Sequence, residues 1–490
     1  MKQYLQIHPA DNVAVALIAL SAGTALDCGV TLAEDIPAGH KLALAEIPEG
    51  ANIVKYGAPI GHATQAIRPG QWVHTHNVHT NLSGLLEYKY EPTPIPEIAP
   101  MQGSFMGYLR PDGRVGVRNE LWIVNTVGCV NKTAERLAAL ANERWGGQVD
   151  GIHAFVHPYG CSQLGEDHAN TQKLLSRMVH HPNAGGVLVL GLGCENNNIP
   201  VFKEVLGETD PARVKFLICQ EVEDELEAGL ELIGELIETM RADVRTEQPL
   251  SKLVIGLKCG GSDGFSGITA NPLLGALSDG VCAAGGTALL SEVPEMFGAE
   301  TILMNRCRDE ATFNAAVELI NGYKRYFMRY GQEIYENPSP GNKAGGITTL
   351  EDKSLGCTQK GGTGRVEGVL HYAESVERHG LNLVYGPGND ICAVTGLMAA
   401  GAQLILVTTG RGTPLGAPVP TLKVATNSAL AKKKANWIDF NAGQLLEGVT
   451  MAEAAQKLLE LVLATASGQL AQNERHGYRE IAIFKDGVTL

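Results

Sequence analysis

Residues 1 to 88 carry short apolar runs separated by turns that contain glycine and proline. The runs are VAVALIAL, KLALAEI, NIVKYG and QWVHTHNV, and the turns between them include IPAGHK, IPEGAN and IRPGQ. Short runs divided in this way are typical of β-strands. We therefore expect a small β-rich domain over residues 1–88. Prolines at positions 92, 94, 96 and 100 then predict a stiff, extended connector over residues 89–102.

A different rhythm begins at residue 103. Apolar runs such as LWIVNTV, IHAFVHP, GVLVLGL and RVKFLIC each precede a longer segment with a helical pattern. This alternation predicts βα units and a mostly parallel sheet over residues 103–245. After a junction at RTEQPLSK, similar alternation resumes over residues 250–490. The chain is thus expected to be an α/β protein, with two α/β domains after the small β domain.

One stretch has neither the helical nor the strand pattern of apolar residues. The sequence GNKAGGITTLEDKSLGCTQKGG, at 341–362, lacks both the 3.6-residue spacing of an amphipathic helix and the alternation of a half-buried strand. A disordered linker is one interpretation, but ordered α/β segments are predicted on both sides. Long loops in compact domains are usually functional. We therefore predict a long active-site loop near 337–362, which clamps an acidic substrate and supplies Lys353, Glu351 and Lys343 as catalytic groups.

Chain length and net charge restrict the number of domains and the kinds of partner. The 490 residues exceed what one hydrophobic core supports, and the formal net charge is −14. Such a surface repels nucleic acid and anionic lipid, so neither is an expected partner. No apolar run approaches the length of a membrane span, and the start of the chain lacks the apolar core of a signal peptide. A cytoplasmic enzyme with a small-molecule substrate is the expectation.

Five cysteines stand beside a glycine, four of them in loops that follow predicted strands and the fifth in the stretch 341–362. They are Cys129, Cys161, Cys194, Cys259 and Cys357. In open α/β sheets ligands bind outside the carboxyl ends of the strands, so these loops are expected to surround a site. Small, often buried thiols also suit tight βα turns without any ligand. No C-x2-C pair supports an iron–sulfur cluster, which stays an alternative.

Two other patterns indicate binding groups. In WVHTHN, His74 and His76 would project from the same face of a strand and could share a divalent metal. An exposed polar face on a β domain explains the same pattern. The loops GPGND and TTGRGTPLG, which contain Asn389 and Arg411, follow predicted strands and could cradle an anion. Tight turns are the alternative, and neither loop is a nucleotide-binding motif.

Taken together, these motifs resemble the altronate/galactarate dehydratase family. The resemblance runs nearly end to end, through VGVRNELW, YGCSQLGEDH, GLGCENN, CGGSDGFSGITANP, NPSPGNKAGGITTLEDKSLGCTQK and TTGRGTP. It implies an N-terminal domain of the SAF type and loss of water from a sugar acid. For D-altronate the product is 2-dehydro-3-deoxy-D-gluconate, in hexuronate breakdown. The family is regarded as dependent on iron(II) or manganese(II) and on reducing conditions. The WVHTHN segment and the terminal EIAIFKDGVTL favour altronate over galactarate.

Such a dehydration removes the proton on C2, beside a carboxylate, and expels the C3 hydroxyl. It needs positive charge near the carboxylate, a base, and help for the leaving group. We expect Lys353 or Glu351 to move the proton, and His74 and His76 to hold iron(II) or manganese(II). The alternative is an iron–sulfur cluster on Cys129, Cys161 and Cys194. The predicted substrate-binding residues are Arg118, Asn119, Ser262, Asp263, Asn389 and Arg411. A related lyase for galactarate, a non-catalytic sugar-acid binding protein and a homo-oligomer stay open.

Overall fold

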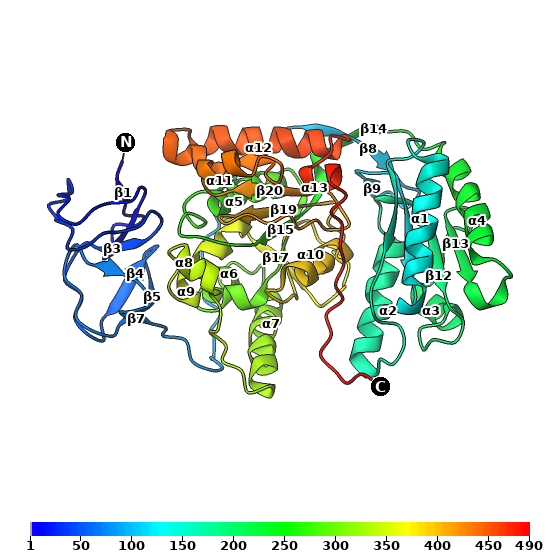
Figure 1. Cartoon of the computed structure of the whole chain (residues 1–490). Helices are drawn as coiled ribbons and strands as arrows, with labels where there is room; N and C mark the ends of the chain where they lie inside the picture. Colours follow the sequence, from blue (N-terminus) through cyan, green and yellow to red (C-terminus); the bar gives the residue numbers. More distant parts are fainter. Residues whose placement is uncertain (1) are drawn as a thin grey trace.

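Three groups of elements follow one another in the computed structural model, which describes residues 2–490. The N-terminal group is built of β-strands in two antiparallel sheets. One sheet contains β1 (Tyr4–Leu5), β2 (Val13–Ala16), β3 (Lys41–Ala43) and β6 (Trp72–Val73), and the other β4 (Asn52–Lys55), β5 (Ala58–Ala63) and β7 (Val78–His79). The expected small β-rich domain is therefore present. Figure 1 shows it on the opposite side of the C-terminal domain from the middle domain.

The middle domain is a four-stranded parallel sheet with helices on both faces. Its elements are β10 (Glu120–Asn125), α1 (Asn131–Trp145), β11 (Gly151–Phe155), α2 (Gly165–Val179), β12 (Ala184–Gly191), α3 (Ile199–Leu206), β13 (Val214–Ile218) and α4 (Glu225–Met240). The spatial strand order is β11-β10-β12-β13, with every pair parallel. Helices α1 and α4 pack together, as do α2 and α3. The predicted parallel sheet is confirmed.

A small sheet joins the middle domain to the C-terminal domain. It contains β8 (Ser104–Leu109), β9 (Val115–Gly116) and β14 (Thr246–Pro249). Strand β14 pairs antiparallel with β8, so the segment RTEQPLSK, expected as a junction, contributes a strand.

The C-terminal domain holds a seven-stranded parallel sheet. Its spatial order is β17 (Val366–Leu370), β18 (Gly380–Val384), β16 (Thr287–Leu290), β15 (Val254–Cys259), β19 (Leu404–Thr409), β20 (Thr421–Ala425) and β21 (Phe440–Asn441). Strand β15 comes first in the chain yet lies between β16 and β19. The chain thus runs outward from β15 in both directions, which makes the carboxyl end of β15 a topological switch point, where ligands bind in such sheets.

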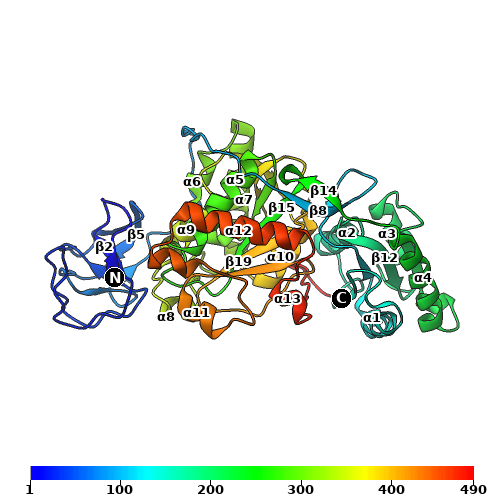
Figure 2. The same ribbon diagram turned by 90° about the horizontal axis from the view of Figure 1, so that it is seen from above.

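Helices cover both faces of this sheet. They are α5 (Ala270–Ala283), α6 (Glu300–Met304), α7 (Glu310–Arg329), α8 (Pro340–Ala344), α9 (Leu350–Cys357), α10 (Asp390–Ala399), α11 (Ser428–Lys433), α12 (Met451–Ala466) and α13 (Gln472–Arg475). Helices α5, α7 and α12 share one apolar core, whereas α10 shares another with α2 of the middle domain. Figure 2 shows α12 lying across this domain. Within residues 2–490, no helix combines the length and apolarity that a membrane crossing requires.

The stretch 337–362 is not the irregular loop that its sequence predicts. It forms α8, α9 and a 3-10 turn, η5 (Thr358–Gly361). All eight residues of α9 are buried, so this helix has no solvent face and shows no amphipathic period. The side chain of Thr349 accepts a hydrogen bond from the backbone N–H of Asp352 and so caps the first turn.

Candidate active site

Charged side chains converge at the carboxyl end of β15. Lys258 and Cys259 end that strand, and Glu292 and Glu295 follow β16. Helix α9 and turn η5 add Lys353, Cys357 and Lys360. All seven side chains are buried. Because burying isolated charges is costly, such a cluster needs close internal pairing.

The pairing in this cluster is close to complete. Lys258 binds Glu292 and also Asp390, at 2.8 Å from the Asp390 carboxylate. Lys360 lies 3.1 Å from Glu292. Lys353 lies 2.7 Å from Glu295.

Three potential metal ligands lie within this cluster. The Cys259 Sγ is 3.5 Å from the Cys357 Sγ and 2.9 Å from Glu295 Oε2, and Cys357 Sγ is 3.2 Å from that same oxygen. Among residues 2–490 this is the one group of three such residues whose ligand atoms lie within 4.8 Å of one another. A tetrahedral ion with sulfur bonds of about 2.3 Å would hold two sulfurs about 3.8 Å apart. The residues therefore fit a divalent ion after a small outward shift, and two thiolates favour iron over manganese.

Neighbouring charges, hydrogen bonds and burial set the protonation of Glu295 and Cys357. Burial raises the pKa of Glu295, but the positive charges of Lys353, Lys258 and Lys360 outweigh it and hold the pKa of this carboxyl well below its usual range. The hydrogen bond with Cys259, together with burial, raises the pKa of the Cys357 thiol. Without a metal, the cluster therefore holds an ionised Glu295 beside a protonated Cys357. A metal ion that displaced the thiol protons would bring its own positive charge in their place. The net charge of the cluster would therefore change little.

The N-terminal domain is fastened to α9 by buried ion pairs. Lys41 and Lys55 lie 2.8 and 2.9 Å from the two carboxylate oxygens of Asp352. Burial alone would raise the pKa of Asp352, but the two lysines outweigh it and lower this pKa far below its usual value. Burial lowers the pKa of Lys41 to about 8 despite its partner. The contact therefore brings positive charge from the N-terminal domain to the edge of the cluster.

A small cavity lies between these two charged groups. Its walls come from Lys55 and Tyr56 of the N-terminal domain, from the loop after β15 and from α9, including Ser262, Lys353 and Cys357. The enclosed space is about 10 Å³, roughly one water molecule. The hydroxyl of Ser262 is buried without a hydrogen-bond partner among the described residues. A substrate larger than water enters only if these walls move apart.

Three family models match this chain. The SAF domain of altronate/galactarate dehydratases matches residues 2–81, the second domain of D-galactarate dehydratase/altronate hydrolase matches 107–241, and the C-terminal model of D-galactarate/altronate dehydratase matches 250–489. The chain belongs to the altronate/galactarate dehydratase family. The expectation drawn from the motifs is thus confirmed.

Curated members of this family are similar over their full length. The altronate dehydratases of Escherichia coli and Bacillus subtilis are 54% and 52% identical, and each alignment covers 100% of both chains. The galactarate dehydratase (L-threo-forming) of E. coli is 33% identical over 95% of this chain and 93% of that protein. The similarity to the two altronate dehydratases is the greater.

The histidines expected to hold the metal of this dehydratase-family chain lie outside the cluster. Strand β6 ends at Val73, so His74 and His76 are in a turn, and the argument that they share a strand face is wrong. His74 is stacked on Trp72, and burial together with Lys41 and neighbouring histidines lowers its pKa to about 3. His76 is exposed. The two belong to no group of three close ligands within residues 2–490.

The Gly-Cys loops divide between two sheets. Cys129, Cys161 and Cys194 are exposed and follow β10, β11 and β12 of the middle domain. Cys259 and Cys357 are buried in the C-terminal domain. The expectation that all five surround one site is therefore wrong, because each parallel sheet has its own carboxyl edge. Whether the three exposed thiols hold a cluster stays a prediction.

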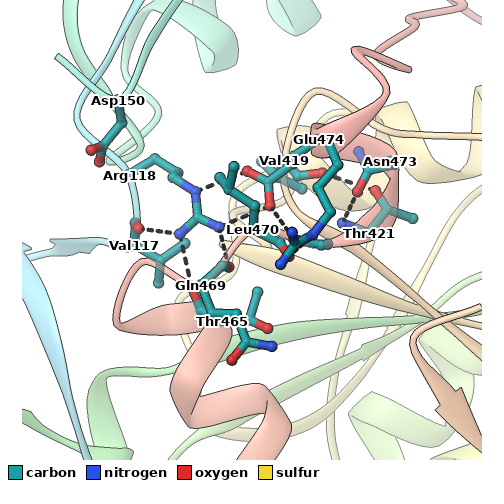
Figure 3. A network of polar contacts seen from close by, with 12 residues as sticks. Val117, Arg118, Asp150, Val419, Thr421, Thr465, Gln469, Leu470, Asn473 and Glu474 are labelled. Atoms are coloured by element: carbon teal, nitrogen blue, oxygen red, sulfur yellow. Dashed lines mark hydrogen bonds and ion pairs between the residues drawn. The ribbon is translucent and has the colours of Figure 1, made fainter. Parts of the chain in front are cut away.

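Arg118 links the middle domain to the C-terminal domain, and Asn119 is bonded within the middle domain, so neither is among the residues that line the cavity. Both carboxylate oxygens of Glu474 accept hydrogen bonds from Arg118 at 2.8 Å, and carbonyls of Val117, Thr465 and Gln469 accept its other N–H groups (Figure 3). Asn119 accepts from Arg110 and donates to the Met240 carbonyl. All five guanidinium donors of Arg118 are used, so the predicted substrate-binding role does not fit.

Glu351 also has a structural partner. Its carboxylate accepts hydrogen bonds from the Thr80 hydroxyl and the Asn81 backbone N–H. It thus fastens the end of the N-terminal domain to α9, and the predicted role in proton transfer does not fit. Lys353, the other predicted proton carrier, lies within the cluster.

Of the remaining predicted residues, Ser262 and Asp263 line the cavity, whereas Asn389, Arg411 and Lys343 do not. Asp263 is buried after β15, where Thr426, Ser266 and Asn427 donate hydrogen bonds to it, and burial raises its pKa. Asp263 and Ser262 both line the cavity, as their predicted substrate role requires. Asn389 caps α10 next to Asp390, and Arg411 is exposed after β19. Lys343, in α8, has no ion-pair partner among residues 2–490.

Sequence reasoning missed Lys258, Glu292 and Glu295. A signal was present in each case. Lys258 is the one charged residue inside the apolar run LVIGLKC, and both glutamates follow the apolar TALL in SEVPEM. A charge at the end of a buried strand must be paired, so it marks a place where a partner is required.

Proposed function

We propose that this chain is a hydro-lyase that converts D-altronate to 2-dehydro-3-deoxy-D-gluconate and water. The observation that carries this proposal is the buried group of Cys259, Glu295 and Cys357 with Lys353 at 2.7 Å from Glu295. It offers a metal-binding set and an adjacent amine in one enclosed place, at the switch point of the sheet. The greater identity to altronate dehydratases than to galactarate dehydratase supports altronate as the substrate.

Three residues of the cluster would bind the metal, and Lys353 would act as the base. Cys259, Cys357 and Glu295 would hold iron(II) or manganese(II), which, when bound, supplies a Lewis acid beside the substrate. Lys353 takes the C2 proton on its Nζ. In the structure Glu295 attracts the Lys353 ammonium strongly enough to outweigh burial and raise its pKa. A metal ion held by Glu295 would weaken that attraction and would itself repel the ammonium, which would lower the pKa of Lys353 and favour its neutral amine.

The ammonium groups of the cluster, although paired with carboxylates, lie where they can stabilise the anionic intermediate. Loss of the C2 proton places negative charge on the substrate carboxylate. Lys258 and Lys360 are buried beside the ligand group, where the low dielectric strengthens their effect. Ser262 and Asp263 are placed to bind substrate hydroxyls. The iron–sulfur cluster, the cytoplasmic location and a homo-oligomer stay predictions.

The test compares turnover of two substrates by matched lysine variants. Formation of 2-keto acid is measured from D-altronate and from galactarate with wild type, Lys353→Met and Lys433→Met. Lys433 is exposed in α11, which makes it the control. We expect wild type to prefer altronate and Lys353→Met to lose about 100-fold or more in kcat, the usual contribution of a general base. Wild-type kcat in Lys353→Met, or turnover of galactarate alone, would contradict the proposal.

A further inference from the structure

We infer that the β4–β5 hairpin of the N-terminal domain completes the active site, and that Tyr56 at its tip donates the proton that leaves with the C3 hydroxyl. The inference rests on the proposed dehydration. It assigns a chemical task to the N-terminal domain, which carries none of the residues placed in the metal group.

The backbone of the hairpin is the first observation. Lys55 pairs with Ala58, so Tyr56 and Gly57 are the two turn residues, with φ of 61° and 74°. Two-residue turns of this kind favour glycine, asparagine or aspartate. A bulky tyrosine with positive φ is uncommon and costs conformational energy. The backbone preference of tyrosine therefore does not favour it in this turn, and any advantage must come from its side chain.

The packing of the phenol is the second observation. A Cβ built on Gly267 would lie 2.1 Å from Tyr56 Oη, and one on Gly356 would lie 3.6 Å from it. Glycine at 267 therefore makes room for the hydroxyl. Gly356 directly precedes Cys357, and Tyr56 lines the same small cavity as Lys353 and Cys357. The hydroxyl is thus delivered from the N-terminal domain to the place where the substrate must lie.

The surroundings suit a proton donor. Burial outweighs the neighbouring cation and raises the pKa of Tyr56, so the group is a neutral phenol. The Lys55 Nζ lies 4.7 Å from the centre of the Tyr56 ring and is itself held by Asp352. This ammonium would stabilise the phenolate that remains after the proton has left.

The elimination needs one base and one acid. Lys353 takes the C2 proton, the C2–H electron pair forms the C2=C3 bond, and the C3–O bond breaks. The departing oxygen takes the Tyr56 proton and leaves as water. The enol becomes the 2-keto acid by gaining a proton at C3 and losing one from oxygen. The proton on Lys353 returns to the phenolate through solvent, so no other reactant is needed.

The first test is Tyr56→Phe, which removes only the hydroxyl. Tyr4→Phe is the control, because Tyr4 lies elsewhere in the same domain and bonds Asp27 at an exposed position. We expect kcat for D-altronate to fall about 100-fold or more in Tyr56→Phe, with KM within about threefold and an unchanged melting temperature. Equal kcat in the two variants would overturn the inference. Absence of turnover in wild type would instead overturn the proposed function.

A second test separates proton donation from packing. The 3-deoxy-3-fluoro analogue of altronate loses fluoride, which needs less help from a proton donor than hydroxide does. The ratio of wild-type to Tyr56→Phe kcat should therefore shrink towards one with this analogue. A ratio that stays as large as with D-altronate would show that Tyr56 only shapes the site.

Discussion

Replacing Asp352 with asparagine tests whether buried ion pairs hold the N-terminal domain on α9. The substitution keeps the shape of the side chain and removes its charge. Asp352 accepts hydrogen bonds from Lys41 and Lys55, and its side chain is 1% exposed. In Asp352→Asn both ammonium groups face a neutral amide inside the protein. Removing one partner of a buried pair costs about 3–5 kcal/mol.

That cost falls on the contact between domains, because both lysines belong to the N-terminal domain and Asp352 to the C-terminal domain. At 1.4 kcal/mol per factor of ten, 3–5 kcal/mol weakens docking by about 100- to 4,000-fold. The expected result is faster cleavage by a protease in the connector 89–102 and thermal unfolding at a lower temperature. Glu49→Gln, an exposed change in the same domain, is the control. A cleavage rate and melting temperature equal to those of the control would refute this reasoning.

Three further predictions concern residues outside the metal group. Arg118→Ala should lower the free energy of unfolding by about 3 kcal/mol in urea, because the buried Glu474 loses one of its two arginine partners and three carbonyls lose their donor, while kcat of the folded protein stays within about twofold. Glu351→Gln should leave kcat within about threefold, whereas loss of a catalytic base would cost 100-fold or more. Between pH 5 and 3 the free energy of unfolding should fall, because Asp352 has a lower pKa in the folded chain, so the unfolded chain binds the proton first. Urea midpoints across this range check the fall, and Asp352→Asn should flatten it.

The strand and helix pattern predicted most of the fold because buried parallel strands are continuous apolar runs. The prediction failed at α9, whose polar side chains have partners far away in the chain. Asp352 and Lys41 are 311 residues apart, and such pairing leaves no local period. The expectation that His74 and His76 share a strand face failed because β6 has only two residues, so strand alternation does not reach them.

Residue type alone did not separate the cysteines by environment. All five stand beside a glycine, yet only Cys259, at the end of β15, and Cys357, at the end of α9, come together, because α9 returns to the end of β15. Similarly, Arg118 and Lys353 are both cations in polar motifs, but one is enclosed by carbonyls and Glu474 and the other lies beside Glu295. Spatial proximity, not composition, decides these roles.

The most direct test of the account is the metal and acid-labile sulfide content of protein purified without oxygen, for wild type, Cys357→Ser and Cys161→Ser. The account predicts about one iron or manganese ion per chain without sulfide, lost in Cys357→Ser and kept in Cys161→Ser. Iron with matching sulfide, lost in Cys161→Ser and kept in Cys357→Ser, would contradict it and move the metal to the middle domain.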